Sequence, residues 1–387
     1  MVERELTPKL RSYAKQFPVI TLTGPRQSGK TTLCRHIFGK HRYFSLENLD
    51  VRRKAMDDPR AFLEDCLPQG AILDEIQRAP ELPSYIQEMV DRWDKSGVFI
   101  LTGSQNFQVF DAVSQSLAGR TALATLLPFS LSEAYPKTPP SLDTILFKGF
   151  YPRIHDKKLN PTEALAFYIS TYLERDMRRL VNIKDLNTFE IFLKLVASRT
   201  GQILNMSALA NDCGVSHNTI RSWLSVLEAS YIIHFVYPHH KNFRKRLIKS
   251  PKVYFVDVGL ASYLLDITEA SHVAHHPLRG ALFETLIVSE VLKARCHAGQ
   301  KPNLYYFRDN VGNEVDLVLD DGLDVVVMEI KSGKTFSPDY LKGIQYYKKL
   351  NAKHIKKALV VYGGTERFKY LNVDVIGMKD IRRGLSF

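Results

Sequence analysis

The chain has 387 residues, more than one hydrophobic core usually serves, so we expect it to fold as two or three domains. Its hydrophobic share of 45% and its charged share of 24% exclude general disorder and a fibrous repeat. Lys and Arg number 53 against 41 Asp and Glu, and the net charge of +12 favours a polyanionic partner. Nucleic acid is the first candidate for that partner, and a basic surface that only confers solubility is the alternative.

The four cysteines are scattered and include no Cys-x-x-Cys pair, which indicates reduced core thiols rather than a zinc site. The first residues are acidic where a signal peptide is basic and then apolar, and no run of about 18 residues stays apolar. We therefore expect a cytoplasmic protein without a membrane partner.

The first part of the chain alternates short apolar strands with helices, the pattern of a parallel sheet covered by helices on both faces. A proline-rich segment at residues 135–140 then breaks the alternation. These features predict an α/β domain over residues 1–160. Its strands are expected at residues 19–23, 43–46, 71–74, 98–102 and 121–127, and its helices begin near Lys30, Asp58, Glu81 and Gln105.

The first strand is followed at once by a sequence that fits G-x-x-x-x-G-K-[ST], the phosphate-binding P-loop. In this motif the backbone N–H groups and the helix N-terminus hold the phosphates, Lys30 reaches the β- and γ-oxygens, and Thr31 is a ligand of Mg²⁺. An ordinary glycine turn is the alternative. The motif therefore predicts ATP and Mg²⁺ as cofactors. The predicted nucleotide-binding residues are Gly24, Pro25, Arg26, Gln27, Ser28, Gly29, Lys30, Thr31 and Thr32.

The third apolar strand ends in two carboxylates, Asp74 and Glu75. With Thr31, Asp74 is the second predicted metal-site residue, while Glu75 would orient and deprotonate the attacking water. Capping of the next helix is the alternative role of this pair. Ser104, after the fourth strand, is a candidate sensor of the γ-phosphate. Arg120 is a candidate arginine finger, with a solvated surface arginine as the alternative.

These segments resemble AAA-superfamily ATPases of bacteria and archaea, in particular a branch in which such a domain is fused to a C-terminal domain of unassigned function. The resemblance implies an ASCE-type sheet with strand order five-one-four-three-two and the site roles given above, except that of Arg120, whose role as a finger is a separate inference. It supplies no settled physiological task. The segments that carry it are residues 24–31, 73–75, 101–104, 118–120, 127–130, 149–152, 172–176, 197–205, 252–260 and 280–293.

The next part of the chain, residues 161–275, is expected to be a helical and winged-helix domain. Helical spacing predicts a buried stripe that includes Phe167 and Ile169. In residues 207–229, Gly214 would end one helix and Ser216 would cap a second, and strand-like runs at 231–237 and 253–256 follow. DNA contact and internal packing remain alternative roles for this module. The predicted DNA-binding residues are His217, Asn218 and Arg221 on the second helix, and Lys245 and Arg246 in a basic run.

The last part, residues 276–387, places Asp316 on one expected strand and Glu329-Ile330-Lys331 on the next. This arrangement resembles the PD-(D/E)xK nuclease superfamily, and it implies a restriction-endonuclease-like α/β domain in which Glu284 on the preceding helix completes the site. Such a site would hold a divalent metal against a phosphodiester, with Lys331 acting on water. The sequence departs from the superfamily pattern where Val315, not proline, precedes Asp316. A surface pairing of charges is the alternative.

Three functions remain at this stage. The first is a P-loop ATPase whose hydrolysis cycle drives a DNA-directed activity of the C-terminal half, acting as a possible homo-oligomer. The second is a nucleotide-gated DNA-binding or scaffold protein whose nuclease-like domain is inactive. The third, a small-molecule kinase, lacks any sequence signal for an acceptor pocket or lid.

Overall fold

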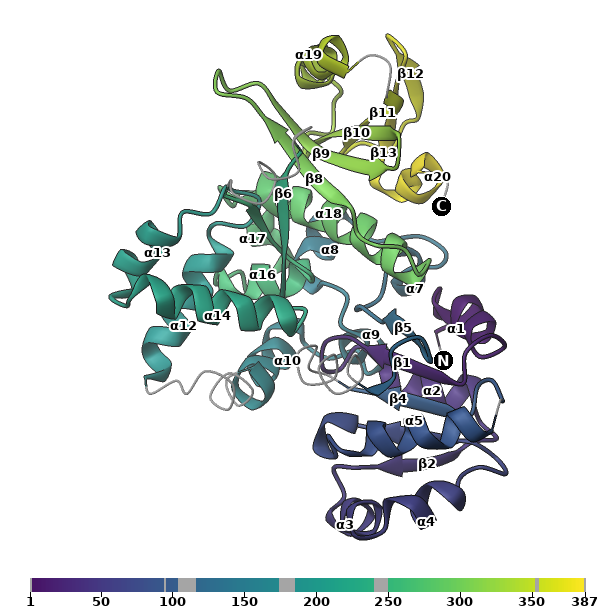
Figure 1. The fold of residues 1–387 in the computed structure, drawn as a ribbon. Helices are drawn as coiled ribbons and strands as arrows, with labels where there is room; N and C mark the ends of the chain where they lie inside the picture. The colour runs from purple at the N-terminus through teal and green to yellow at the C-terminus, as the bar shows by residue number, and fades with distance from the viewer. Residues whose placement is uncertain are drawn as a thin grey trace. The chain divides into compact units, whose positions relative to one another are not determined.

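The computed structural model describes residues 2–93, 95–103, 116–173, 185–239, 250–351 and 355–385 (Figure 1). The chain divides into two compact units. The N-terminal unit comprises Met1–Phe129 and two short later segments, Ala229–Tyr231 and Cys296–Gln300. The C-terminal unit comprises Ser130–Glu228, Ile232–Arg295 and Lys301–Phe387.

The N-terminal unit is built on a five-stranded parallel sheet. Its order, β2-β3-β4-β1-β5, is the five-one-four-three-two order that the resemblance to AAA-superfamily ATPases implied, and each expected strand is present within two residues of its expected ends. The register pairs Val19 of β1 with Phe99 of β4 on one side and with Thr121 of β5 on the other. The strands are β1 (Val19–Thr23), β2 (Arg42–Ser45), β3 (Ala71–Asp74), β4 (Phe99–Thr102) and β5 (Thr121–Thr125).

Each face of this sheet is buried under its own helices. Successive strand side chains point to opposite faces, so Leu73 and Leu101 enter one apolar core while their neighbours Ile72 and Ile100 enter the other. Buried residues of α3, α4 and α5 pack into the first core, and those of α1 and α2 pack into the second. The central strands β3 and β4 are therefore buried along their whole length, as expected of a parallel sheet covered on both sides.

The helices of the N-terminal unit start at recognisable caps. Asn48 accepts hydrogen bonds from the first turn of α3, a helix that the sequence patterns did not predict, and Asp58 caps α4. The helix expected from Gln105 lies mostly in residues 104–115, outside the described residues. The described helices are α1 (Thr7–Tyr13), α2 (Lys30–Ile37), α3 (Leu49–Asp57), α4 (Pro59–Glu64), the 3₁₀ turn η1 (Ile76–Arg78) and α5 (Leu82–Arg92).

The C-terminal unit begins with helices. The predicted apolar stripe is wrong at Phe167, whose surface is 67% exposed, whereas Leu165, Tyr168 and Ile169 are buried. The prediction is confirmed at Ile169, while Tyr168 is buried in place of Phe167, and a π-helical turn, η2 (Ile169–Leu173), then breaks the α-helical phase. The helices are α7 (Leu131–Ala134), α8 (Leu142–Lys148), α9 (Pro152–Asp156), α10 (Pro161–Tyr168), α12 (Leu186–Ala197), α13 (Met206–Cys213), α14 (His217–Ala229), α16 (Val258–Leu264), α17 (Ala270–Val273), α18 (Arg279–His297), α19 (Lys342–Asn351) and α20 (Ile381–Leu385), with the 3₁₀ turns η3 (Pro338–Leu341) and η5 (Met378–Asp380).

Helices α13 and α14 form the expected helix-turn-helix. Gly214 ends α13 in the left-handed conformation, with φ of 65°, and the hydroxyl of Ser216 accepts a hydrogen bond from the N–H of Thr219 at 3.1 Å. Trp223 of α14 is buried with its ring centroid 5.3 Å from that of Phe189 on α12. This apolar contact orients the opposite face of α14 outward.

One mixed sheet of eight strands runs through the C-terminal unit, in the order β12-β13-β11-β10-β9-β8-β6-β7. The antiparallel ribbon β6–β7 joins it because β6 pairs with β8, so the ribbon and the last strands share a sheet across the expected boundary at residues 275 and 276. Helix α19 packs on one face, where Ile344 and Tyr347 enter the core. The strands are β6 (Ile233–Pro238), β7 (Lys252–Phe255), β8 (Leu304–Arg308), β9 (Glu314–Asp321), β10 (Asp324–Lys331), β11 (Ile355–Tyr362), β12 (Phe368–Tyr370) and β13 (Val373–Gly377).

Among the helices that the structure describes, none combines the length and the apolar character that crossing a membrane requires.

Candidate functional site

The loop after β1 has the backbone conformation that a phosphate-binding loop needs. Gly24 has φ of 144°, and a Cβ atom there would lie 2.1 Å from the carbonyl oxygen of Leu126. Gly29, with φ of 94°, is the left-handed residue from which α2 begins. Both positions therefore require glycine. The loop continues directly into the N-terminus of α2, where free backbone N–H groups can bind a phosphate.

Lys30 lies buried inside this loop. Its ammonium donates hydrogen bonds to the carbonyl oxygens of Gly24 at 2.9 Å and Pro25 at 2.8 Å. Burial lowers the pKa of Lys30 to about 8, although the carboxylates of Glu75 and Asp74 act in the opposite direction. The positive charge of the ammonium is thus held at the loop by neutral carbonyl groups and is not fully balanced there. This arrangement suits a phosphate anion.

Asp74 lies at the end of β3 and accepts three hydroxyl hydrogen bonds. Thr31 donates to its Oδ2 at 2.9 Å, and Thr102, at the end of β4, donates to its Oδ1. A threonine hydroxyl and a carboxylate side by side are the hard oxygen donors that Mg²⁺ prefers. The residues present therefore fit a magnesium ion held by Thr31 with Asp74 beside it.

Glu75 follows Asp74 in the left-handed conformation, with φ of 60°. Its carboxylate accepts a hydrogen bond from the side-chain amide of Gln77 and makes no capping hydrogen bond to the turn η1 that it precedes. Asp74 likewise accepts from hydroxyls rather than from helix N–H groups. These contacts do not support the helix-capping alternative. The negative charge of Glu75 raises the pKa of Lys30, against the effect of burial.

Sequence reasoning missed Tyr43, whose hydroxyl donates to Oδ2 of Asp74 at 2.8 Å. Burial and this hydrogen bond raise the pKa of Tyr43 to about 12, so the phenol stays protonated. The parallel register pairs Ser45 with Asp74, and Tyr43, two residues earlier on β2, faces the same side of the sheet. The alternation of side chains along β2, together with the expectation that β2 lies beside β3, could have indicated that Tyr43 faces Asp74.

Arg4 was also missed. Its guanidinium donates to the carbonyl oxygen of Ser28 in the loop at 2.7 Å and to that of Leu127 after β5 at 2.6 Å, and it stacks over the ring of Phe129. Arg4 therefore ties the P-loop to the end of β5. No local sequence pattern predicts this contact, because Arg4 and Leu127 are separated by 123 residues.

The structure does not bring Arg120 to the loop. Its carbonyl oxygen accepts from the N–H of Val19, the first residue of β1, whereas the P-loop follows the last residue of that strand. A five-residue strand separates these two ends by about 13 Å. The guanidinium instead forms a two-pronged ion pair with Asp91, at 2.5 Å and 2.8 Å. Arg120 thus cannot act as a finger for the nucleotide of its own chain. Ser104 lies outside the described residues.

A second group of chemistry-bearing residues lies in the C-terminal unit, where β9 and β10 run antiparallel. Lys331 donates to Asp316 at 2.7 Å and to Glu329 at 2.8 Å, and the N–H of Ile330 also donates to Asp316. Asp316 and Glu329 are 7% and 5% exposed, so the alternative of a surface charge pairing is wrong. A Cβ atom at Gly343 would lie 2.2 Å from Glu329, which shows how closely α19 covers it.

Glu284 of α18 joins this carboxylate cluster through a lysine that sequence reasoning missed. Lys252 of β7 is buried and pairs with Glu284 at 3.1 Å and with Glu314 at 2.6 Å. The hydroxyl of Tyr254 also donates to Glu284, at 2.5 Å. We name the group of Glu284, Glu314, Asp316, Glu329, Lys252 and Lys331 the carboxylate cluster.

Within the carboxylate cluster, the pKa values of Glu329 and Asp316 are shifted in opposite directions. Burial and the neighbouring Asp316 raise the pKa of Glu329 to about 9. Burial alone would raise the pKa of Asp316 as well, but Lys331 and Lys252 outweigh it and hold that pKa below its usual value. At neutral pH, Glu329 is therefore the acid and Asp316 the carboxylate of a buried pair, because two adjacent carboxylates resist ionising together.

The predicted DNA-binding residues on α14 lie where the sequence placed them. His217, Asn218 and Arg221 are exposed, on the side opposite the buried Ile220 and Leu224. Lys245 and Arg246 lie outside the described residues.

Three family models match the sequence in succession: an AAA domain over residues 16–135 and two domains of unknown function over residues 139–271 and 279–381. Uncharacterized proteins of Mycobacterium tuberculosis and Mycobacterium bovis are each 30% identical to this chain over 373 residues, which cover 94% of this chain and 81% of theirs. The chain belongs to the family of these mycobacterial proteins. Its resemblance to AAA-type ATPases is confirmed by the AAA domain, and this domain supports ATP binding and hydrolysis.

Among the solved structures that match this chain is a Walker-type ATPase of Pyrococcus abyssi, at 14% identity and a TM-score of 0.46, over 68% of this chain and 96% of that one. Another is an AMPPCP-bound DnaA of Aquifex aeolicus, at 14% identity and a TM-score of 0.31, over 58% of this chain and 85% of that one. The family models match the regions of the expected winged helix and nuclease-like domain only as domains of unknown function.

Proposed function

We propose that the P-loop of this AAA-type ATPase hydrolyses ATP with Lys30, Thr31, Asp74 and Glu75 as its working residues. The observation that carries the proposal is the convergence of Thr31 and Asp74, at 2.9 Å, beside a buried Lys30 whose ammonium contacts only the carbonyls of the loop among the described hydrogen bonds. Bound Mg²⁺ supplies charge neutralisation for the phosphates and orients them.

The roles of the side chains follow from where they lie. Lys30 exchanges its loop carbonyl partners for phosphate oxygens, which are the stronger acceptors because they are charged. Thr31 provides a hydroxyl oxygen to the metal, and Asp74 holds that hydroxyl in place. Glu75, which directly follows Asp74 at the end of β3, accepts the proton of the attacking water. A phosphoryl-transfer enzyme that excludes water has no use for this last group.

Release of phosphate from Mg-ATP by the purified full chain tests the proposal. Lys30→Ala is expected to abolish hydrolysis, because it removes the positive charge that follows the γ-phosphate. Hydrolysis that persists unchanged in this variant would show that the activity belongs to another site or to a contaminant. Because Arg120 lies at the end of the sheet opposite the P-loop of its own chain, its role as an arginine finger requires a second copy of the chain.

We further propose that the chain works on DNA, and that its three functional segments are the ATPase domain, residues 1–160, a winged-helix segment, residues 161–275, and a nuclease-like domain, residues 276–387. The exposed face of α14 and the net charge of +12 support DNA binding. The buried carboxylates Asp316 and Glu329, which share Lys331, support a divalent-metal site, since carboxylates are oxygen donors that Mg²⁺ or Mn²⁺ takes. Glu284 pairs with Lys252 instead and is not gathered with them closely enough to bind the same ion. With metal bound, Lys331 would position water against a phosphodiester.

One observation favours the alternative of a nuclease-like domain that does not cleave. Every carboxylate of the carboxylate cluster already has a lysine partner, Lys252 for Glu284 and Glu314, and Lys331 for Asp316 and Glu329. A metal ion must compete with these two ammonium groups. Incubation of plasmid and linear DNA with the full chain and Mg²⁺ or Mn²⁺, with and without ATP, separates the two functions.

A further inference from the structure

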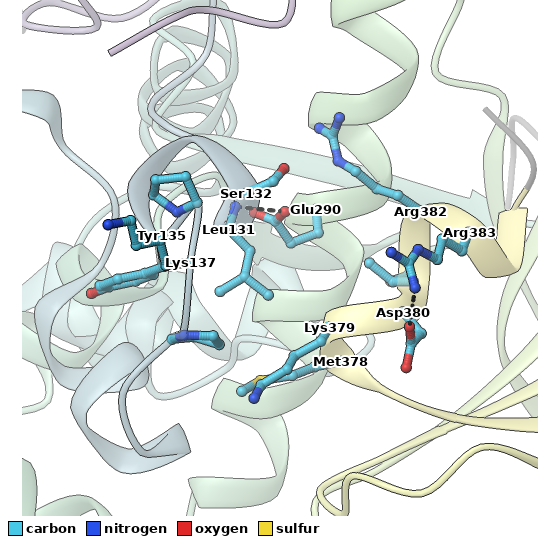
Figure 2. A pocket seen from close by; sticks show the side chains of 13 residues that line it. Leu131, Ser132, Tyr135, Lys137, Glu290, Met378, Lys379, Asp380, Arg382 and Arg383 are labelled. Atoms are coloured by element: carbon cyan, nitrogen blue, oxygen red, sulfur yellow. Dashed lines mark hydrogen bonds and ion pairs between the residues drawn. The ribbon is translucent and has the colours of Figure 1, made fainter. Parts of the chain in front are cut away.

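The C-terminal unit contains a pocket that neither the P-loop nor the carboxylate cluster uses. It has a volume of about 460 Å³, within the range of small-molecule sites in proteins. Figure 2 shows α18 behind the pocket, α7 with the segment that follows it on one side and the segment η5–α20 on the other. Residues 131–139 and 378–383, far apart in the sequence, thus form its two walls.

The charge of the lining is predominantly positive. Four basic side chains line the pocket, Lys137, Lys379, Arg382 and Arg383, against two acidic ones, Glu290 and Asp380. Within the part of the chain that the structure describes, Lys137 and Lys379 take part in no ion pair, and Arg383 pairs with Asp380 only at 3.8 Å. These three cations are exposed and can turn toward a bound anion.

The buried acid of the pocket is already neutralised. Glu290 is 2% exposed, and one of its oxygens accepts from the ammonium of Lys293 at 3.0 Å while the other accepts from the N–H of Leu131 at 2.9 Å. Lys293 is itself fully buried and cannot pair elsewhere on the surface. Glu290 therefore fixes the back wall without opposing an anion at the mouth.

The remaining lining is apolar, from Leu131, Pro136, Pro139, Met378 and Ile381, with the ring of Tyr135 beside them. A ligand that satisfies both parts of the lining carries a negative group for the cations and a flat or apolar part for these side chains. A phosphate group attached to such a body fits both. From this pocket we propose a second anion-binding site, separate from the P-loop, that binds the phosphate of a nucleotide-sized ester or of a nucleic-acid strand.

Equilibrium dialysis with AMP tests this site, in the full chain carrying Lys30→Ala so that the P-loop is weakened. Adenosine, which has the same ring system without phosphate, is the control ligand. The pair Lys379→Ala and Arg383→Ala is expected to weaken AMP binding at least about tenfold, through lost charge-assisted hydrogen bonds. The matched control pair, Lys342→Ala and Lys369→Ala, removes the same charge from side chains that are 77% and 78% exposed outside the pocket.

Three results would overturn the proposal: no saturable binding of AMP, equal binding of AMP and adenosine, or equal loss in the two variant pairs. Once AMP binding is established, competition with a short single-stranded DNA identifies the source of the phosphate. Displacement of AMP assigns the pocket to nucleic-acid strands, and its persistence assigns the pocket to small phosphate esters. The result does not depend on whether the P-loop hydrolyses ATP.

Discussion

Tyr43 donates a hydrogen bond of 2.8 Å to Oδ2 of Asp74, the same oxygen that accepts the hydroxyl of Thr31. Two side chains from different elements, β2 and α2, therefore hold one carboxylate oxygen. When the hydroxyl oxygen of Thr31 serves a metal ion, Tyr43 is placed to keep the carboxylate of Asp74 in position. Tyr43 is on this basis a positioning residue of the ATPase.

Tyr43→Phe removes only that hydroxyl. Because a hydrogen bond to a charged group contributes about 1.5 to 3 kcal/mol, we expect the Mg²⁺ concentration for half-maximal hydrolysis to rise about tenfold. Nucleotide affinity measured without metal is expected to stay unchanged, which separates a positioning role from a general loss of structure. If Tyr43→Phe and the wild type need the same Mg²⁺ concentration, Tyr43 does not position Asp74 for the metal ion.

Lys30→Ala and Glu75→Gln are expected to fail in different ways. Loss of the Lys30 ammonium weakens nucleotide binding and hydrolysis together. Glu75→Gln retains binding of Mg-ATP but slows hydrolysis by at least about 100-fold, since an amide cannot accept the proton of water. Fluorescent-nucleotide titration alongside phosphate release distinguishes the two, and matching losses of binding in both variants would argue against the role of Glu75.

The carboxylate cluster makes a prediction about metal and stability. If Asp316 holds a metal ion, Mn²⁺ raises the melting temperature of the wild type, and Asp316→Ala loses that shift. Lys331→Ala leaves Asp316 and Glu329 without their shared counter-ion, so we expect it to unfold at lower temperature in EDTA and to gain more from Mn²⁺ than the wild type does. ATP hydrolysis is expected to survive in both variants. If the wild type shows neither a metal-induced shift in melting temperature nor cleavage of DNA, the domain is not a nuclease and serves instead as a binding surface.

The burial of His155 is expected to make the free energy of unfolding fall in acid. Burial lowers its pKa to about 4, although its hydrogen bond to the carbonyl of Gly149, at 2.9 Å, acts in the opposite direction. The unfolded chain takes up this proton near pH 6.5, so the stability is fully present above pH 6.5 and falls by up to about 3 kcal/mol as pH drops toward 4. His155→Gln is expected to flatten urea-unfolding free energy over this window. His234 shifts in the same direction and serves as the internal comparison, and an unaltered slope in the variant would refute the assignment.

Arg221 on α14 tests the DNA-binding proposal. Arg221→Ala is expected to weaken binding of duplex DNA and, if the guanidinium contacts a phosphate, to flatten the salt dependence by about one unit. Lys194→Ala is the matched control, because Lys194 is exposed on α12 but already pairs with Asp266 at 2.7 Å. ATP hydrolysis without DNA is expected to be unchanged in both. Identical DNA affinities for the two variants would favour α14 as an internal packing element.

The sequence by itself determined the P-loop, the strands of the first sheet and the helix-turn-helix, whereas the order of those strands came from the resemblance to AAA-superfamily ATPases. In each case the information is local, because Gly24 and Gly29 specify left-handed backbone, alternating apolar runs specify buried strands, and Gly214 with Ser216 specifies a helix end and a helix cap. Asp316, Glu329 and Lys331 were also found together, since period-two alternation on two adjacent strands puts them on one face.

Only the tertiary structure decided which residues complete these sites. Tyr43 reaches Asp74, Arg4 reaches Ser28 and Lys252 reaches Glu284 across 24 to 32 residues of sequence. Arg120, suggested by its place before β5, lies at the end of the sheet opposite the P-loop of its own chain, because parallel strands start at one end of a sheet and finish at the other. Local periodicity records which face of an element is buried, but partners across elements depend on how strands are ordered and helices packed, and no short sequence pattern carries that information.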